Sequence, residues 1–249
     1  MYVQHHVPGP PLSEHVGLLW LYDGWVAGHA RERLLPTGSM NLIVGLRDRM
    51  ALFVGAYSEP GLLDTSRAIS VIGAYFHPGG AFPFLDLPAN ELHNLDVNLE
   101  DLWPAGEARV LREQLHAARM ERKIGVLERA LIERLRRPRN PFVAFALREF
   151  RRPLPVKAVA DRIGVSQRTF IQSFAREVGM TPKLFCRVTR FQRALRMVHR
   201  RAEVDWAEVA LACGYFDQPH FNRDFREFSG LTPSQYLELR TEHLNHVPV

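Results

Sequence analysis

The carboxyl-terminal part of the chain contains one pattern twice, and this duplication limits its fold more than any other feature. Nine positions match with a single gap, at an offset of 50 that becomes 51 after one inserted residue. The matches are Val159-Ala160 with Val209-Ala210, Gly164 with Gly214, Phe170 with Phe221, Phe174 with Phe225, Gly179 with Gly230, Thr181-Pro182 with Thr232-Pro233, and Phe185 with Tyr236. A repeat of this length indicates a structural unit that occurs twice.

Each copy is predicted to be a helix, a tight turn and a second helix. In the first copy, Gly164 is expected to end the helix at 156–163, because glycine adopts a positive φ at little cost. Ser166 is a suitable N-cap for the next helix. In the second copy, Asp205 is a suitable N-cap for the first helix, and Gly214 lies at the turn. In both copies the paired phenylalanines, four residues apart, share the inward face and form the core.

The opposite face of each second helix carries side chains that can read DNA. Gln, Asn and Arg pair with adenine or guanine edges in the major groove, where a helix-turn-helix presents its second helix. A single exposed helix of this kind is more often only solvated. Two such helices in a duplicated unit favour DNA binding. The outward residues are Gln167, Arg168, Ile171 and Gln172 in the first copy, and Gln218, Asn222, Arg223 and Arg226 in the second.

A long helix is predicted between the two units, at 182–200. Its apolar stripe is about 19 residues long, which corresponds to roughly 28 Å of helix. A rod of this length would place two recognition helices about one turn of DNA apart, roughly 34 Å, so that they enter successive major grooves. The arginines on the polar sides of this helix could contact phosphates or could simply be solvated, and the sequence supports both equally. Those sides carry Arg187, Arg190, Arg193 and Arg196.

The net charge of +5 is unevenly distributed along the chain. Residues 1–140 carry 15 Lys and Arg against 16 Asp and Glu, whereas residues 141–249 carry 17 against 11. The net charges are therefore −1 and +6, which suggests a polyanionic partner for the second part. The excess of arginine over lysine, 29 to 3, could equally reflect codon bias.

The amino-terminal part is predicted to be β-rich, with strands at 18–25, 41–46, 51–57 and 69–76. Short helices are expected at 81–87 and after Pro88, and two helical stripes follow at 107–135 before a proline-containing connector at 136–141. The predicted fold class is α+β with two domains. Residues 1–140 form a cupin-like β-rich domain with a helical extension. Residues 141–249 form an all-α domain with helix-turn-helix units at about 156–178 and 205–228, joined by the helix at 182–200.

Residues 156–240 resemble the DNA-binding domain of the AraC/XylS transcriptional regulators. The residues that carry the resemblance are Gly214-Tyr215, His220-Phe221-Asn222-Arg223-Asp224-Phe225, Gly230-Leu231-Thr232-Pro233 and Tyr236. The family implies two helix-turn-helix motifs that bind duplex DNA to control transcription. Two residues depart from the commonest pattern, since Pro219 replaces a polar residue and Ile171 cannot hydrogen-bond a base. We therefore expect more polar specificity from the second recognition helix.

The resemblance, together with the outward faces, gives two sets of candidate DNA-binding residues. The candidates for base contact are Gln167, Arg168, Ile171, Gln172, Gln218, Asn222 and Arg223. The candidates for phosphate contact are Lys157, Ser166, Arg187, Arg190 and Arg226.

The amino-terminal part resembles, more loosely, the β-rich sensor halves of many family members, which implies ligand sensing, dimerisation or both. The stripes at 107–135 are either a dimer surface or pack on the sheet, and the sequence supports both equally. Five aromatic residues are speculative lining for an effector pocket, although a core role is favoured for each. They are Trp20, Tyr22, Trp25, Tyr57 and Phe76.

An enzyme is the main alternative class, and the sequence does not favour it. His5-His6, His29 and His77 lack the His-x-His spacing of a metal cupin, and we find no phosphate loop, nucleophile elbow or Cys-His pair. We expect no catalytic residue, metal or cofactor. No run of 18 apolar residues and no signal peptide is readable, so a cytoplasmic protein with no membrane partner is expected.

The predicted function is a sequence-specific, double-stranded DNA-binding transcription regulator, with activation favoured. The expected partners are DNA, RNA polymerase, a small-molecule effector and a second copy of the chain. The alternative is an effector-binding module with little specific DNA binding.

Overall fold

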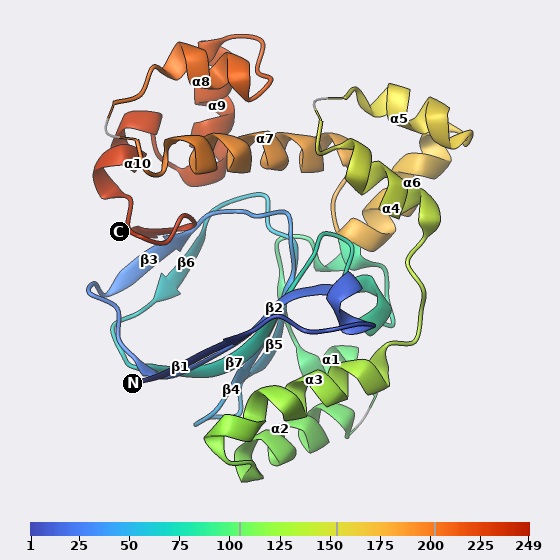
Figure 1. Cartoon of the computed structure of the whole chain (residues 1–249), viewed down its shortest axis with the longest axis vertical. Helices are drawn as coiled ribbons and strands as arrows, with labels where there is room; N and C mark the ends of the chain where they lie inside the picture. Colours follow the sequence, from blue (N-terminus) through green and yellow to red (C-terminus); the bar gives the residue numbers. More distant parts are fainter. Residues whose placement is uncertain (105, 153, 202) are drawn as a thin grey trace.

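The computed structural model describes residues 1–104, 106–152, 154–201 and 203–249. A β-rich part with helices on one side is followed by a mainly helical part, in which smaller helices lie at both ends of the long α7 (Pro182–Val198) (Figure 1). The predicted all-α domain at 141–249 is thus not wholly helical, because its last residues include a strand, β9 (His246–Pro248). This arrangement confirms the predicted α+β class with two helix-turn-helix units on one long helix.

The strands form two antiparallel sheets. The larger has the order β1-β2-β7-β4-β5-β8, and the smaller has the order β6-β3-β9. The strands are β1 (Tyr2–His6), β2 (Val16–Trp25), β3 (Arg31–Leu34), β4 (Asn41–Gly45), β5 (Ala51–Val54), β6 (Gly61–Asp64), β7 (Ile69–Phe76), β8 (Asp96–Asn98) and β9 (His246–Pro248). The four predicted strands correspond to β2, β4, β5 and β7, and the other five were not predicted.

The larger sheet has one fully buried face. In β2, Leu19 and Leu21 are fully buried, whereas Trp20 and Tyr22 lie on the other face and are half-buried. This alternation is the pattern expected of a strand with one face in the core. The helical extension covers that buried face (Figure 1). It comprises α1 (Leu99–Leu102), α2 (Glu107–Ala117) and α3 (Lys123–Arg134).

The apolar stripes of α2 and α3 belong to the core. Leu111 and Leu115 of α2 and Leu127 and Leu131 of α3 are each at most 2% exposed. Of the two interpretations of these stripes, the structure therefore supports packing on the sheet over an exposed dimer surface. The two predicted short helices are 3-10 turns, η2 (Phe82–Phe84) and η3 (Ala89–Leu92).

The helical part begins at the predicted connector. Its helices are α4 (Pro141–Glu149), α5 (Val156–Ile163), α6 (Gln167–Val178), α7, α8 (Trp206–Ala212), α9 (Gln218–Ser229) and α10 (Pro233–Leu239). Gly164 ends α5 with φ at +75°, as expected for a residue that takes the left-handed conformation. The predicted caps are also present, because Ser166 accepts a hydrogen bond from the Thr169 amide and Asp205 accepts one from the Ala207 amide.

The two parts are joined by direct contacts as well as by the connector. The side-chain amide of Gln192, buried on α7, donates hydrogen bonds to the Pro36 carbonyl (2.8 Å) and to Asn245 Oδ1 (2.8 Å). Strand β9, which follows the second helix-turn-helix unit, pairs with β3 and places Val247 opposite Arg33. The smaller sheet therefore contains residues from both ends of the chain.

A buried carboxylate lies at this junction. Glu32 is 2% exposed, and its two oxygens lie 2.7 Å from His29 Nε2 and 2.6 Å from His246 Nδ1. Burial alone would raise the pKa of Glu32, but hydrogen bonds to His246 and His29 lower it below the usual range. The charge on β3 is thus compensated partly by a residue of β9.

The connector is fastened to the amino-terminal part by Arg139. Its guanidinium donates to the carbonyl of Glu14 (2.9 Å) and to that of Pro78 (2.6 Å). Burial, and then the nearby charge of Arg139, lower the pKa of both His15 and His77. These two histidines are therefore kept neutral in the folded protein.

We expect acid to weaken the fold through these histidines. A base whose pKa is lowered by folding stabilises the protein fully above its unfolded pKa of about 6.5, and this contribution is lost as the pH falls below that value. The free energy of unfolding should fall between about pH 7 and about pH 5, by up to about 1.4 kcal/mol per pH unit for one histidine. Urea unfolding at several pH values measures the slope.

The variant His15→Gln should reduce this slope, because glutamine does not titrate. The control is His116→Gln, which changes an exposed histidine on α2 and should leave the slope as in the wild type. Parallel pH profiles for the wild type and His15→Gln would contradict the prediction.

Candidate nucleic-acid interface

The second recognition helix, α9, has one buried face and one polar face. Asp217 caps it by accepting a hydrogen bond from the His220 amide (2.8 Å). Phe221, Phe225 and Phe228 are fully buried beneath it. Helical periodicity then turns Asn222 and Arg223 outward, where both are exposed. The predicted division between a core face and a polar face is therefore present.

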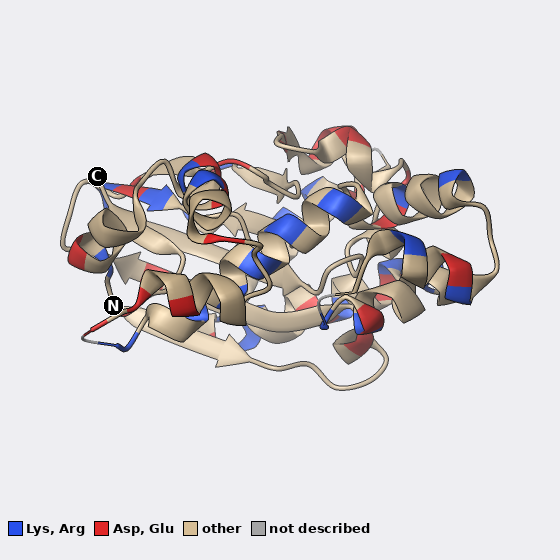
Figure 2. Ribbon diagram, turned by 90° about the horizontal axis from the view of Figure 1, so that it is seen from above, with Lys and Arg blue, Asp and Glu red and all other residues tan. Residues whose placement is uncertain are grey.

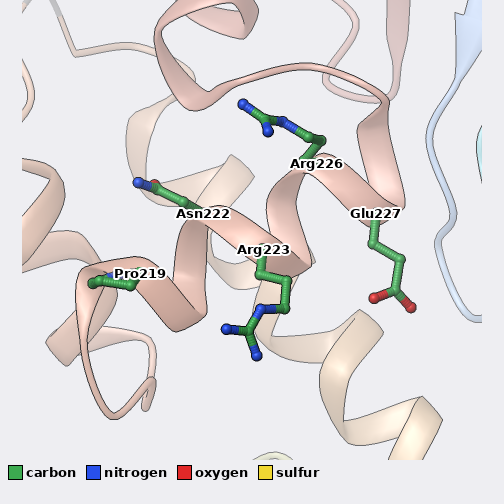
Figure 3. A pocket seen from close by; sticks show the side chains of 5 residues that line it. All are labelled: Pro219, Asn222, Arg223, Arg226 and Glu227. Atoms are coloured by element: carbon green, nitrogen blue, oxygen red, sulfur yellow. The ribbon is translucent and has the colours of Figure 1, made fainter.

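The polar face of α9 borders a shallow hollow. The residues that line it are Pro219, Asn222, Arg223, Arg226 and Glu227. In Figure 3 Asn222 and Arg226 extend to one side of the helix, and Arg223 and Glu227 extend to the other. Pro219 lies in the first turn, where a missing backbone N–H has no helical partner to lose. The departure from the commonest sequence pattern is thus compatible with an intact helix.

The first recognition helix, α6, has one apolar residue among its candidates for base contact. Gln167, Arg168 and Gln172 are exposed, but Ile171 is half-buried and apolar. Of the predicted phosphate contacts at this unit, Lys157 is exposed on α5, and the Ser166 hydroxyl also lies 2.8 Å from Thr169 Oγ1. Because each helix exposes three polar candidates for base contact, the expectation that α9 carries more polar recognition than α6 stays a prediction.

The helix α7 is strongly basic. It contains Lys183 and four arginines and has no Asp or Glu. Figure 2 shows basic residues along a long central helix. Positive charge attracts a polyanion such as DNA. The contacts that each arginine makes within the protein determine whether its guanidinium can also bind a phosphate.

Two of the predicted phosphate contacts are engaged within the protein. Arg187 Nη2 lies 2.7 Å from Asp224 Oδ1 and 2.6 Å from Glu227 Oε2. Hydrogen bonds, first to Glu227 and also to Asp224, raise the pKa of Arg187. Arg190 lies over the ring of Tyr215, at 4.9 Å from its centroid. Both side chains are therefore engaged within the protein, Arg187 with α9 and Arg190 with the turn before α9, whereas Arg226 of α9 is exposed.

The sequence did not predict the acidic partners of Arg187. Asp224 lies three residues after Phe221, and helical periodicity places it near the buried side of α9. A buried acid requires a partner, and the arginines of α7 supply one. A buried acid on α9 together with arginines on α7 was therefore the sequence signal that could have predicted this contact.

The five predicted ligand residues do not form one group. Trp20, Tyr22 and Trp25 lie side by side on β2, with ring centroids 5.5 Å and 6.2 Å apart. Tyr57 instead donates a hydrogen bond to Asp96 Oδ1 (3.2 Å). Phe76 is fully buried and stacks on Phe53, so it lies in the core beneath the sheet, which is the role that the sequence favoured for it.

Within residues 1–104, 106–152, 154–201 and 203–249, no group of three His, Cys, Asp or Glu residues is arranged to hold a metal ion. Among the helices in those ranges, none has the length and apolar character needed to cross a membrane.

Comparison with known proteins gives two family matches. Residues 159–239 match a family described as "Helix-turn-helix domain", and residues 4–98 match a domain of unknown function, DUF6597. The HTH-type transcriptional activator RhaS of Escherichia fergusonii is 27% identical over 105 residues, which are 42% of this chain and 37% of that protein. The chain thus spans less than half the length of the curated relatives it matches.

Two solved structures illustrate the likeness in three dimensions. An AraC-type transcriptional regulator from Chromobacterium violaceum has a TM-score of 0.37 and 24% identity, over 41% of this chain and 94% of that one. ToxT from Vibrio cholerae has a TM-score of 0.41 and 8% identity, over 97% of each chain. At these TM-scores the description of the fold rests on the strands and helices given above.

The duplicated units, their exposed polar faces and the match at 159–239 together define a helix-turn-helix domain. Residues 159–239 thus match an AraC-type helix-turn-helix domain, and the curated relatives that the chain matches are named as transcriptional regulators.

Proposed function

We propose that the chain is a sequence-specific regulator of transcription that places α6 and α9 in successive major grooves of duplex DNA. The observation that carries this proposal is the exposed polar face of α9, with Asn222, Arg223 and Arg226 free of the core. Bidentate pairing of Asn with adenine and of Arg with guanine is the chemistry that such a face supplies. The candidate base contacts on α6 are Gln167, Arg168, Ile171 and Gln172.

We propose that the two parts of the chain have different functions. Residues 1–140 form a sensor or dimerisation domain, and residues 141–249 form the DNA-binding domain. Activation through contact with RNA polymerase is the favoured mode, in line with the name of the RhaS relative. A small-molecule effector and a cytoplasmic location complete the proposal. Trp20, Tyr22 and Trp25 support the effector, because they present neighbouring aromatic rings on one strand.

Selection of DNA fragments on the purified full-length protein tests the proposal. The selected fragments should share two short half-sites whose centres lie about one helical turn, roughly 10 base pairs, apart. Enrichment without a shared motif, which disappears when the salt concentration is raised, would mean that only phosphates are recognised and would overturn the proposal.

Replacing Arg223 by alanine should weaken binding to the selected site by about 1–3 kcal/mol and relax the preference at one base pair. The reason is that alanine cannot donate the two hydrogen bonds that a guanine edge accepts. Arg226→Ala is the matched comparison on the same helix. As a phosphate contact, Arg226 should affect all sequences alike and lower the salt dependence by about one charge.

Fluorescence anisotropy with the selected site and with single-base variants measures both effects. Circular dichroism should show unchanged helix content in both variants, since both side chains are exposed. Unchanged affinity and base preference in Arg223→Ala would remove the base-contact assignment of that residue.

A further inference from the structure

The junction between α7 and α9 has an apolar layer and a charged layer. In the apolar layer, the ring of Phe191 on α7 meets Phe225 and Phe228 of α9, with centroids 5.2 Å and 5.5 Å away. The hydrophobic contribution of these contacts is non-directional, because it depends on the apolar area removed from water. The apolar layer alone therefore holds α9 against α7 without fixing its rotation tightly.

The charged layer has directional contacts that the apolar layer lacks. Arg187 donates through Nε and Nη2 to Asp224 Oδ1, at 3.2 Å and 2.7 Å. It also donates through Nη1 and Nη2 to the two oxygens of Glu227, at 3.0 Å and 2.6 Å. The planar guanidinium thus spans two acids that are three residues apart on one flank of α9, and its own plane rests on Phe228 at 5.0 Å.

Asp224 depends on this arginine. Its side chain is 2% exposed, and its Oδ2 makes no hydrogen bond to any described residue. Arg190 Nη2 lies 3.8 Å from that oxygen, which is too far for a hydrogen bond. Because a buried charge without a partner is costly, α9 is held in the orientation that brings Asp224 to Arg187.

The first unit has no equivalent of this fork. At the offset of 51, Ser173 and Arg176 of α6 replace Asp224 and Glu227, so α6 has no acid at either position. Instead, the end of α6 lies on the amino-terminal part, where a Cβ atom at Gly179 would meet Met40 and Ala56. The two recognition helices are therefore oriented by different means.

We propose that Arg187 is a positioning residue that fixes the orientation of α9 on α7 and thereby sets the spacing between half-sites that the protein accepts. This inference rests on the proposed function, in which α6 and α9 read two half-sites of one DNA molecule. In this arrangement Asn222 and Arg223 select the bases that α9 contacts. Arg187, Asp224 and Glu227 set the spacing between the half-site read by α9 and the half-site read by α6.

The test uses Arg187→Lys in the full-length protein. Lysine keeps the charge but cannot span two carboxylates with a planar fork. The matched control is Arg196→Lys, which makes the same change at an exposed position of the same helix. The DNA probes are the selected site and copies of it with one base pair inserted or removed between the half-sites, together with a probe that retains only the half-site read by α9.

The quantity to measure is the ratio of the affinities for the native and the altered spacing, because this ratio does not depend on the fraction of active protein. Inserting one base pair turns the half-sites by roughly 35° relative to one another, since DNA has about 10 base pairs per turn. The wild type and Arg196→Lys should discriminate strongly against this change. In Arg187→Lys the ratio should fall several-fold, while the affinity for the single half-site should stay within about twofold.

Two results would overturn the inference. An unchanged ratio in Arg187→Lys would show that α9 is oriented without the fork. An equal loss on every probe, with a salt dependence lowered by about one charge, would show that Arg187 contacts a phosphate instead. A wild type that selects no pair of half-sites would overturn the proposed function itself, and that result is visible before any variant is made.

Discussion

Replacing Phe225 by alanine should lower the free energy of unfolding by about 3–5 kcal/mol. The side chain is fully buried at the centre of the second helix-turn-helix unit. Its ring meets those of Phe191, Phe221 and Tyr236, with centroids 5.2 Å, 5.5 Å and 5.7 Å away. Alanine would leave a cavity between α7, α9 and α10, which cannot all move inward, because α7 is also packed on the amino-terminal part.

Urea unfolding followed by circular dichroism measures the loss. The control is Phe216→Ala in the same unit, where the ring is 86% exposed and its removal should cost less than about 0.5 kcal/mol. A loss below about 1 kcal/mol for Phe225→Ala would show that the site collapses around the smaller side chain and that the aromatic cluster is not the core we describe.

The second large effect is expected at Gly179, which ends α6 with φ at +90°. A Cβ atom at this position would lie 2.6 Å from Met40 Cε and 3.0 Å from Ala56 Cβ. Gly179→Ala therefore adds a strained backbone, about 1–3 kcal/mol, to an overfilled contact, about 1–3 kcal/mol. The expected loss is roughly 2–6 kcal/mol, with the recognition helix α6 displaced from the amino-terminal part.

Gly164→Ala separates the two contributions. Gly164 has φ at +75°, but no atom lies within 4 Å of the Cβ position, so only the backbone cost applies. The difference between the two variants in urea unfolding should be at least about 1 kcal/mol. An equal loss of unfolding free energy in both variants would mean that the contact between α6 and the amino-terminal part accommodates the added methyl group at no cost.

The helical part was predictable because its signals are local. Gly164, Ser166 and the pairs Phe170 with Phe174 and Phe221 with Phe225 each act within one or two turns of helix, and the repeat showed every signal twice. The strand β9 was not predictable in this way. Its three residues carry no alternation of their own, and their partner β3 begins at Arg31.

The same distinction between local signals and contacts distant in the sequence applies to the candidate site. Helical periodicity identified the exposed faces of α6 and α9, because exposure follows from position on a helix. It did not identify the role of Arg187, whose partners lie 37 and 40 residues away.

The pairing of β9 with β3 also has a consequence for synthesis. Strands β3 and β6 leave the ribosome early, whereas β9 follows the whole second helix-turn-helix unit. One edge of β3 therefore stays without a partner while about 200 residues are translated, which takes roughly 10–40 s at 5–20 residues per second. An open edge of this kind can pair with other chains. Nascent protein should thus be most prone to aggregation in this interval and should depend most on chaperones then.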